Sequence, residues 1–258
     1  MRAVMLMESI SIFVSPRRRL SAAIEEAIVD GAIACARLNL RPKDALFHSG
    51  DEVDTTFYLA RGLIRLYSVN DAGDTKTVFL HKAGSLIGFQ MLQSDDDDRS
   101  SATGGETGLV MTGRESRGPY KSILNAEATA NCEVFALDAL QFRDFLKAHG
   151  DICFEYARYL FDMLANQTRE SVNGSIYPVL ERFAALLLTI ANELNLPPAP
   201  AVVPFTNADL ASMLGVHPNS VTNAIAALRR AECVERQHNC LLITDYRKLK
   251  RIAGDLIS

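Results

Sequence analysis

Between Thr206 and Ile243 the apolar positions follow a helical period twice, with a glycine between the two segments. Thr206 and Asp209 have the spacing of a capping box, so a first helix is predicted to begin there. Gly215 accepts the positive φ of a tight turn, and Pro218 takes the first position of a second helix, where its missing N–H costs nothing. The pattern predicts a helix-turn-helix followed by a small β-wing.

The second of these helices has one apolar stripe and one polar face. Val221, Ile225 and Leu228 recur at the 4-and-3 spacing of a buried stripe. Opposite them, Asn219 and Asn223 can each make a bidentate contact to adenine, worth about 1–3 kcal/mol of base discrimination. Nearby arginines are expected to contact phosphates. The predicted DNA-binding residues are Thr206, His217, Pro218, Asn219, Ser220, Thr222, Asn223, Arg229, Arg230, Arg236 and His238. The alternative is an ordinary helix pair with a solvated polar face.

From Leu46 to Gln90 the pattern changes to short β-type runs separated by turn residues, with a hairpin turn at residues 70–74. Glycines recur where successive corners are expected, at Gly50, Gly62, Gly73, Gly84 and Gly88. The runs resume from Ala128 to Leu137, after which Asp138 is predicted to cap a short helix. These runs predict an antiparallel β-roll of the cupin or jelly-roll kind. Before them, Leu20 to Leu38 has helical spacing and is predicted to be an N-terminal helix.

A long helix is predicted from Gly150 to Val172, with two apolar stripes. The first steps like a heptad seam and contains Ile152, Tyr156, Tyr159, Met163, Asn166 and Glu170. The second contains Cys153, Ala157, Leu160 and Leu164. One stripe suits the roll and the other a twin helix, and the predicted dimer interface is Ile152, Tyr156, Tyr159, Met163 and Asn166. An amphipathic helix buried within a monomer is the alternative. Asn173 to Ser175 is predicted to be a hinge, and Pro178 to Leu194 the next helix.

Length and composition favour two globular domains, because 258 residues with 48% hydrophobic content can bury a full core. The net charge of −4 excludes a generally basic nucleic-acid coat, so DNA binding requires a local patch. From Pro178 onward there are eight Arg or Lys against seven Asp or Glu, so the acidic excess lies upstream. The basic run at Arg17 follows the N-terminal apolar residues, the wrong order for a secretory signal, and no segment is apolar for long enough to span a membrane.

Metal and catalytic chemistry find little support in the sequence. The five cysteines form no C-x-x-C pair and fit free thiols in a reducing cytoplasm. Ser94 to Pro119 is of low complexity and is predicted to be a solvated loop; its run Asp95 to Asp98 lacks the spacing of a calcium loop, so no metal is expected. The histidines His48, His81, His149, His217 and His238 show no ligand spacing. With no catalytic constellation, an enzyme built on the roll is disfavoured.

The order of roll, long helix, hinge and winged helix-turn-helix resembles the cyclic-AMP receptor protein/FNR (Crp/Fnr) family of bacterial regulators. The matching motifs are Phe47-His48-Ser49-Gly50-Asp51, Tyr58-Leu59-Ala60-Arg61-Gly62, Ala83-Gly84 with Ile87-Gly88, and the helix-turn start from Asp209 to Val216. The resemblance covers nearly the whole chain from Leu38 onward. It implies an α+β homodimer that binds an effector between roll and long helix and places two DNA-binding domains on a pseudo-palindromic operator, with RNA polymerase as an expected partner.

The chain departs from the family in both motifs that contact ligands. Cyclic-nucleotide members have Gly-Glu and a downstream Arg-Ser, whereas Phe89 and Gln90 follow Gly88 here. A phosphate buried without a cation is strongly penalised, so cyclic AMP is not expected to bind. The Leu86 to Phe89 string resembles the halo-respiration regulators, which sense small aromatic acids. The predicted effector-binding residues are Phe57, Phe79, His81, Gly88, Phe89, Gln90 and Tyr156, the alternative being that the aromatics are core.

The reading helix departs as well. Where most family members have Arg-Glu-Thr-Val-x-Arg, this chain has Pro218-Asn219-Ser220-Val221-Thr222-Asn223, so the family's base preference does not transfer. The predicted domains are an N-terminal segment 1–40, an effector-binding roll 41–148, a dimerisation helix and hinge 149–175, and a DNA-binding domain 176–258. The predicted function is a non-enzymatic, effector-responsive transcriptional regulator without an identified cofactor. The alternative is a ligand-binding module that regulates a partner protein without sequence-specific DNA binding.

Overall fold

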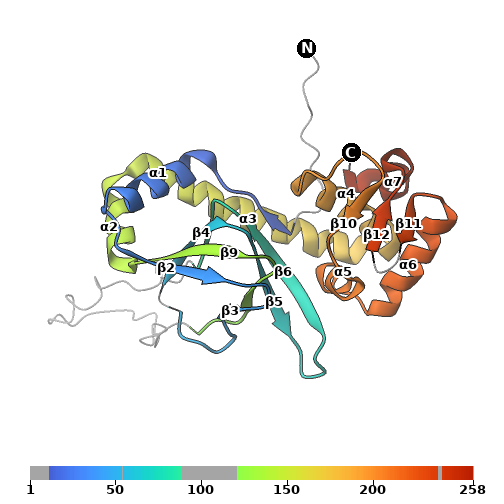
Figure 1. The fold of residues 1–258 in the computed structure, drawn as a ribbon, viewed down its shortest axis with the longest axis horizontal. Coiled ribbons are helices and arrows are strands. Elements are labelled where there is room, and N and C mark those ends of the chain that lie inside the picture. Colours follow the sequence, from blue (N-terminus) through green and yellow to red (C-terminus); the bar gives the residue numbers. More distant parts are fainter. Residues whose placement is uncertain (1–11, 54, 89–120, 238–239, 258) are drawn as a thin grey trace, which may run out of the picture. The chain divides into compact units, whose positions relative to one another are not determined.

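The computed structural model describes residues 12–53, 55–88, 121–237 and 240–257. Contacts divide the chain into two compact units. One unit contains Arg65–Leu80 and Tyr159–Ser258 together with the short segment ending at Val14, and the other contains Ser15–Ile64 and His81–Arg158. The chain is of the α+β class, with antiparallel sheets in the N-terminal part and a helix-turn-helix in the C-terminal part (Figure 1).

The unit with Ser15–Ile64 is built on a four-stranded antiparallel sheet. Its strand order is β2 (Cys35–Leu40), β9 (Cys132–Leu137), β4 (Thr56–Arg61) and β7 (Ser85–Ile87). A second antiparallel pair joins β3 (Ala45–Phe47) to β8 (Asn125–Ala128). The buried residues Tyr58, Leu59 and Val134 place the core against this sheet. The predicted β-roll is confirmed.

Gly62 shows why one of the predicted corners requires glycine. Its φ of 102° is unfavourable for other residues, and a Cβ there would lie 2.5 Å from Cys132 Sγ and 2.6 Å from the Asn131 carbonyl oxygen. Real Cβ atoms do not approach other atoms so closely, so any side chain would push β4 away from the turn before β9.

The predicted N-terminal helix is wrong in its second half. Helix α1 (Arg18–Val29) buries Leu20, Ile24 and Ala27 on one face, as the helical spacing requires. It ends at Asp30, and Gly31 follows with a φ of 71°. The next segment is β2, which pairs with β9 from Cys35↔Leu137 to Leu40↔Cys132. This long-range pairing overrides a local pattern that fits either structure.

Helices α2 (Ala139–Ala148) and α3 (Gly150–Ile176) follow the strands. Asp138 caps α2 by accepting from the Gln141 N–H at 2.9 Å, as predicted. The predicted hinge from Asn173 to Ser175 is wrong, because these residues are helical. The Asn173 carbonyl still accepts the Tyr177 N–H at 3.1 Å. The helix ends because Pro178 disfavours helical geometry at the residue before it, and Pro178 then precedes α4 (Val179–Glu193).

Strands β5 (Leu63–Val69) and β6 (Thr75–Lys82) form a hairpin, and its residues Arg65–Leu80 belong to the other unit. Strand β1 (Phe13–Val14) lies beside β6. The Asn70 N–H donates to the Asp74 carbonyl at 3.0 Å in the predicted turn. Its C-terminal part holds α4, α5 (Asn207–Leu214), α6 (Pro218–Arg230) and α7 (Tyr246–Ala253), with a short 3-10 helix over Gly254–Ile257.

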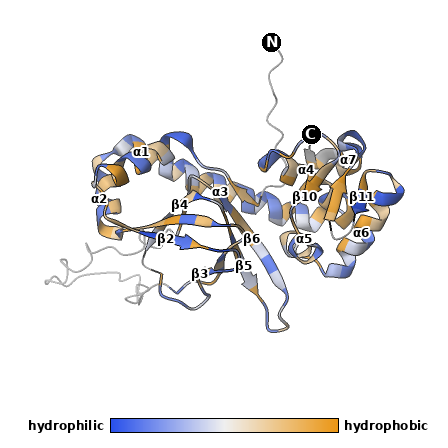
Figure 2. Cartoon of the chain, in the orientation of Figure 1, coloured by the Kyte–Doolittle hydropathy of each residue, from blue (hydrophilic) through white to orange (hydrophobic). Residues whose placement is uncertain are grey.

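A three-stranded antiparallel sheet completes this part, in the order β10 (Ala201–Val203), β12 (Cys240–Ile243) and β11 (Val234–Gln237). Figure 2 shows β10 and β12 as hydrophobic strands. Helix α4 is buried along most of its length, from Arg182 to Ala191, and α5, α6 and α7 pack against it. It is the central helix of the C-terminal core.

Candidate DNA-binding interface and sensing region

The helix-turn-helix is built by the local interactions that its sequence predicts. Thr206 Oγ1 accepts the Asp209 N–H at 3.2 Å, and Asp209 Oδ2 accepts the Thr206 N–H at 2.9 Å, so the capping box is closed. Helix α5 ends at Gly215, whose φ of 65° is left-handed. Pro218 then begins α6, and His217 Nδ1 accepts the Asn219 N–H at 3.2 Å. These contacts satisfy N–H groups that a helix start otherwise leaves without partners.

Helix α6 divides its residues as predicted. Val221, Ile225 and Leu228 are buried, and Ala224 joins them. The opposite face is exposed and consists of Pro218, Asn219, Thr222, Asn223 and Ala226. Thr222 donates its hydroxyl to the Pro218 carbonyl at 3.2 Å. For Asn219 and Asn223 no side-chain hydrogen bond is recorded within the part of the chain that the structure describes, so both amides are available to a ligand.

Three of the predicted arginines lie outside this polar face, two at the end of α6 and one on β11. Arg229 and Arg230 are exposed in the last turn of α6, and Arg236 is exposed on β11. Elsewhere in the same unit, helix α7 has the exposed cations Arg247, Lys250 and Arg251, which are absent from the predicted set. The basic run from Arg247 to Arg251 was the signal that could have identified them.

The other predicted DNA-binding residues have different surroundings. Thr206 is exposed, but its hydroxyl belongs to the capping box and also donates to Asp209 Oδ2 at 2.7 Å. Ser220 is half-buried, and its N–H donates to the His217 carbonyl at 2.9 Å. His238 lies outside the described residues. Thr206 therefore stabilises the start of α5, whereas the side-chain amides of Asn219 and Asn223 on α6 are exposed and available to a ligand.

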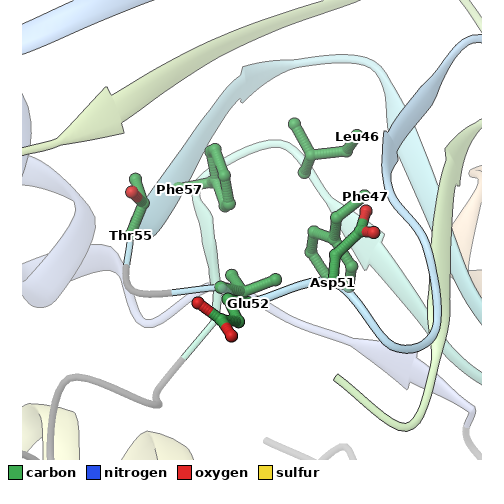
Figure 3. Close-up of a pocket in the computed structure, with 7 residues that line it drawn as sticks. Leu46, Phe47, Asp51, Glu52, Thr55 and Phe57 are labelled. Carbon is green, nitrogen blue, oxygen red and sulfur yellow. The ribbon is translucent and has the colours of Figure 1, made fainter. Parts of the chain in front are cut away.

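An open pocket of about 410 Å³ lies between β3 and β4, in the unit that contains Ser15–Ile64. Figure 3 shows Phe47 and Phe57 beside Leu46, with Asp51, Glu52 and Thr55 on the connecting segment. The Phe47 and Phe57 rings stack with centroids 6.2 Å apart. Asp51 Oδ2 accepts the His48 N–H at 2.7 Å, so this carboxylate stabilises its own turn.

The predicted effector-binding residues do not share one environment. Phe57 lines the pocket beside Phe47, whereas Tyr156 is buried in an edge-to-face contact with Phe142, with ring centroids 5.9 Å apart. Phe79 is half-buried on β6. The structure therefore gives Phe57 and Tyr156 different aromatic neighbours. Phe89 and Gln90 lie outside the described residues.

His81 and Gly88 belong to the unit that contains Ser15–Ile64, and both are held by contacts within the protein. His81 is fully buried on β6, and burial lowers its pKa to about 3, so its imidazole is neutral at pH 7. Gly88 has a φ of 81°, and its carbonyl accepts the Thr56 hydroxyl at 2.8 Å. Among the described residues no group of three or more His, Cys, Asp or Glu is placed to hold a metal. The Asp95 to Asp98 run lies outside them.

The predicted dimer seam is wrong about which stripe of α3 is free. Ile152, Tyr156, Tyr159 and Met163 are all buried within the single chain, with exposed fractions of 7% or less. Asn166 is half-buried, and its side-chain oxygen accepts from Arg169 at 3.3 Å. The first stripe therefore belongs to the core of the single chain, where close packing decides which side chains fit.

The outward face of α3 carries large apolar residues. Phe154, Phe161 and Leu164 are exposed by 64%, 67% and 65%. With Ala157 and Thr168, which are also exposed, they step by 3, 4, 3 and 4 residues. This is a heptad rhythm. Leu164 and Ala157 belong to the second stripe of the sequence prediction, whereas the two phenylalanines belong to neither.

Comparisons with known proteins agree with this architecture. A model of the Crp-like helix-turn-helix domain matches residues 181–252, and a model of the cyclic nucleotide-binding domain matches residues 37–111. The cAMP-activated global transcriptional regulator of Haemophilus influenzae is 20% identical over 84% of this chain and 88% of its own length. The chain belongs to the Crp/Fnr family. It is a DNA-binding transcriptional regulator of the Crp/Fnr type with a cyclic nucleotide-binding domain.

Solved structures show the same fold. A CRP/FNR-family transcriptional regulator from Thermus thermophilus has a TM-score of 0.66 at 19% identity, covering 85% of this chain and 99% of that one. The c-di-GMP responsive global regulator CLP of Xanthomonas campestris has a TM-score of 0.68 at 12% identity, covering 87% and 99%. Among the described residues no helix is long and apolar enough to cross a membrane.

Proposed function

We propose that this Crp/Fnr regulator acts as a homodimer that reads a pseudo-palindromic operator through Asn219 and Asn223, and that a small molecule other than cyclic AMP controls it. The observation that carries the proposal is the exposed polar face of α6, whose amides make no recorded hydrogen bond among the described residues. Amides of this kind match the donor and acceptor pair that adenine presents in the major groove. We expect A·T pairs at the positions they contact.

Dimerisation is proposed to use the outward face of α3. Three large apolar side chains, Phe154, Phe161 and Leu164, each have about two thirds of their surface exposed. Their heptad spacing fits a second copy of the same helix better than a flat surface. Burying such side chains stabilises an assembly by about 1.5–3 kcal/mol each. Their exposure in the single chain therefore supports a helix pair along this face.

Two readers related by a two-fold axis impose a geometry on the DNA. Helix-turn-helix dimers bind half-sites whose centres are about one helical turn apart, so the operator is expected to be an inverted repeat. Arg229, Arg230 and Arg236 flank the reading face and are proposed to contact phosphates. Once bound to such an operator, the dimer is proposed to act on RNA polymerase.

The effector is proposed to differ from cyclic AMP because of the two residues after Gly88. These are Phe89 and Gln90, neither of which carries the carboxylate that receives a ribose hydroxyl in cyclic-nucleotide members. Among the described residues, the lining of the pocket beside Phe57 contains Asp51 and Glu52 and no Lys or Arg. Such a lining disfavours a phosphate. Of the predicted effector-binding residues, Phe57 is the one proposed to contact the effector in this pocket.

A salt titration tests the proposal against a module that binds only proteins. The full chain is mixed with a fluorescent duplex of random sequence, and anisotropy is followed from low to high salt. Phosphate contacts give a linear fall of log K with log salt, with a slope of about −0.9 for each contact. Three cations in each subunit predict a steep slope. Absence of binding at low salt would refute the DNA-reading role.

A further inference from the structure

An ionic cluster of one half-buried lysine and two buried charged residues holds the end of the first helix of the helix-turn-helix. Its members are Lys76 on β6, Glu170 on α3 and Arg182 on α4, and all three belong to the same compact unit as α5 and α6. Lys76 Nζ lies 3.4 Å from Glu170 Oε1, and an Arg182 guanidinium nitrogen lies 3.7 Å from the same oxygen. The residues Glu170 and Arg182 are 7% and 6% exposed.

Both cations donate to the last carbonyls of α5. Lys76 Nζ donates to the Met213 carbonyl at 3.1 Å, and Arg182 donates to the Leu214 carbonyl at 2.7 Å. The last four carbonyls of a helix have no partner within it and carry the negative end of its dipole, so cations are favoured there. Glu170 balances part of this charge from α3.

The chain makes room for Lys76 at the turn itself. A Cβ on Gly215 would lie 2.7 Å from Lys76 Cδ, in addition to the strain of its positive φ. The lysine stem therefore lies directly against the turn between the two helices, three residues before α6 begins at Pro218. Desolvation lowers the pKa of Lys76, and the charge of Glu170 opposes this shift.

Two further contacts tie the β5–β6 hairpin to the same face of α5. Thr77 and Ser212 are buried, and their hydroxyls are 2.9 Å apart. An Arg65 guanidinium nitrogen lies 3.7 Å from Asp209 Oδ1, the carboxylate that closes the capping box. Residues 209, 212 and 213 are at helical spacing, so the hairpin meets one face of α5 at both of its ends.

We propose that Lys76 is a positioning residue for DNA reading: with Arg182 and Glu170 it clamps the end of α5 and so fixes where the recognition helix α6 starts. The clamp draws on β6, α3 and α4, so the placement of the reader depends on the hairpin and on the helix that is proposed to form the dimer. The effect of the clamp on DNA reading rests on the proposed function of α6. The contacts that form the clamp do not depend on that function.

The test compares Lys76→Met with Lys76→Arg, which keeps the charge and the donors, and with Lys147→Met, which removes an exposed lysine from α2. Amide hydrogen exchange is measured on the full chain at Gly215 and Val216, whose N–H groups donate to the Ser212 and Ala211 carbonyls. Exchange at both is expected to rise about tenfold in Lys76→Met, because the variant lacks a charged hydrogen bond. Lys76→Arg and Lys147→Met should stay near the wild type.

A DNA readout separates positioning from general stability. Sequences selected by the wild-type protein from a random duplex pool are compared with unselected duplex. Lys76→Met should lose about tenfold in the ratio of selected to unselected affinity, with affinity for unselected duplex retained. Lys76→Arg should restore the ratio. Equal loss on both kinds of DNA would overturn the positioning role.

The two failures are distinguishable. If the wild type selects no sequence, the proposed function fails while hydrogen exchange still tests the clamp. If Gly215 and Val216 exchange at wild-type rates in Lys76→Met, the clamp is refuted whatever the DNA result. Should Lys76→Met not fold, Thr77→Val removes the neighbouring hydroxyl contact and is expected to raise the same two exchange rates by a smaller factor, and unchanged rates would contradict the proposal.

Discussion

Helices α3 and α6 both present an outward face, and the two faces have opposite chemistry. The face of α6 is short and polar, with Asn219 and Asn223 at its centre. The face of α3 exposes Phe154, Phe161 and Leu164. Exposed side-chain amides form hydrogen bonds with water, so their exposure costs little free energy. Large apolar side chains, by contrast, lower the free energy when they leave water. The difference supports the two proposed partners, which are nucleic acid for α6 and a second copy of α3 for α3.

The largest expected effect comes from a charge on the outward face of α3. Phe161→Glu removes two apolar anchors from a symmetric dimer and places two carboxylates near each other. We expect the dissociation constant to rise at least about a hundredfold, or about 3 kcal/mol. Light scattering at micromolar concentration should show monomers, and circular dichroism should show that these monomers remain folded. A Phe161→Glu protein that remains a dimer would place the interface elsewhere.

Met163→Glu is the matched control, because Met163 is on the same helix but is 5% exposed within its own chain. A buried, unpaired carboxylate should destabilise the fold by about 3–5 kcal/mol. Urea unfolding would show this as a lower midpoint. If Met163→Glu instead yields stable monomers, the inward stripe is the dimer seam after all.

A smaller effect is expected on the polar face of α6. Asn223→Ala or Asn219→Ala should cost about 1–3 kcal/mol at one base position and relax the preference there, while affinity for unrelated DNA stays nearly constant. Competition binding against single-base variants of a selected operator measures this. Full discrimination in both mutants would move the readers to other residues of the motif.

Two histidines extend the comparison to the two compact units. His81 is buried on β6 with its pKa lowered to about 3, whereas His217 is exposed at the start of α6. The unfolded chain protonates His81 near pH 6.5, but the folded chain does not, so stability is lost as the pH falls below about 6.5. Between pH 7.5 and 5.5 the loss attributable to His81 is about 1.4 kcal/mol.

Urea unfolding of the wild type and of His81→Gln at both pH values tests this. The wild type should lose about 1.4 kcal/mol more than His81→Gln over the interval. Equal pH dependence in the wild type and His81→Gln would mean that His81 is solvated or charged in the folded protein.

The smallest effect is expected from single flanking cations. Arg229→Ala should weaken binding to every DNA sequence alike and make the salt dependence shallower by about one unit if this side chain holds one phosphate. Glu235→Ala on the exposed side of β11 is the control, since it removes a charge that phosphate repels. A sequence-dependent weakening in Arg229→Ala would make this arginine a base reader.

The same two helices show how far the sequence predicts the structure. In α6 the decisive contacts are local, because the capping box of Thr206 and the turn at Gly215 depend on residues a few positions apart. Such signals are readable from the sequence. In α3 the period gives two stripes but not the partner of each, because the choice depends on how well the aromatic residues fit a core built from distant strands. The strand β2 was missed for the same reason.

The site was predicted unevenly for related reasons. The exposed amides of α6 followed from helical spacing alone. The clamp of Lys76, Glu170 and Arg182 acts over long stretches of sequence, since Lys76 and Met213 are 137 positions apart, and no local pattern announces it. The cations of α7 were visible as a basic run, but only the fold shows that Arg247, Lys250 and Arg251 are exposed beside a pair formed by Lys248 and Glu232.

Selection from a random duplex pool with the full-length protein tests the central claim most directly. The account predicts that repeated rounds enrich an inverted repeat with half-sites about one helical turn apart and with A·T pairs at corresponding positions in each half. It also predicts that Phe161→Glu enriches no inverted repeat under the same conditions. Recovery of no preferred sequence, or of a single unpaired half-site by the wild type, would contradict a dimeric regulator that reads DNA through α6.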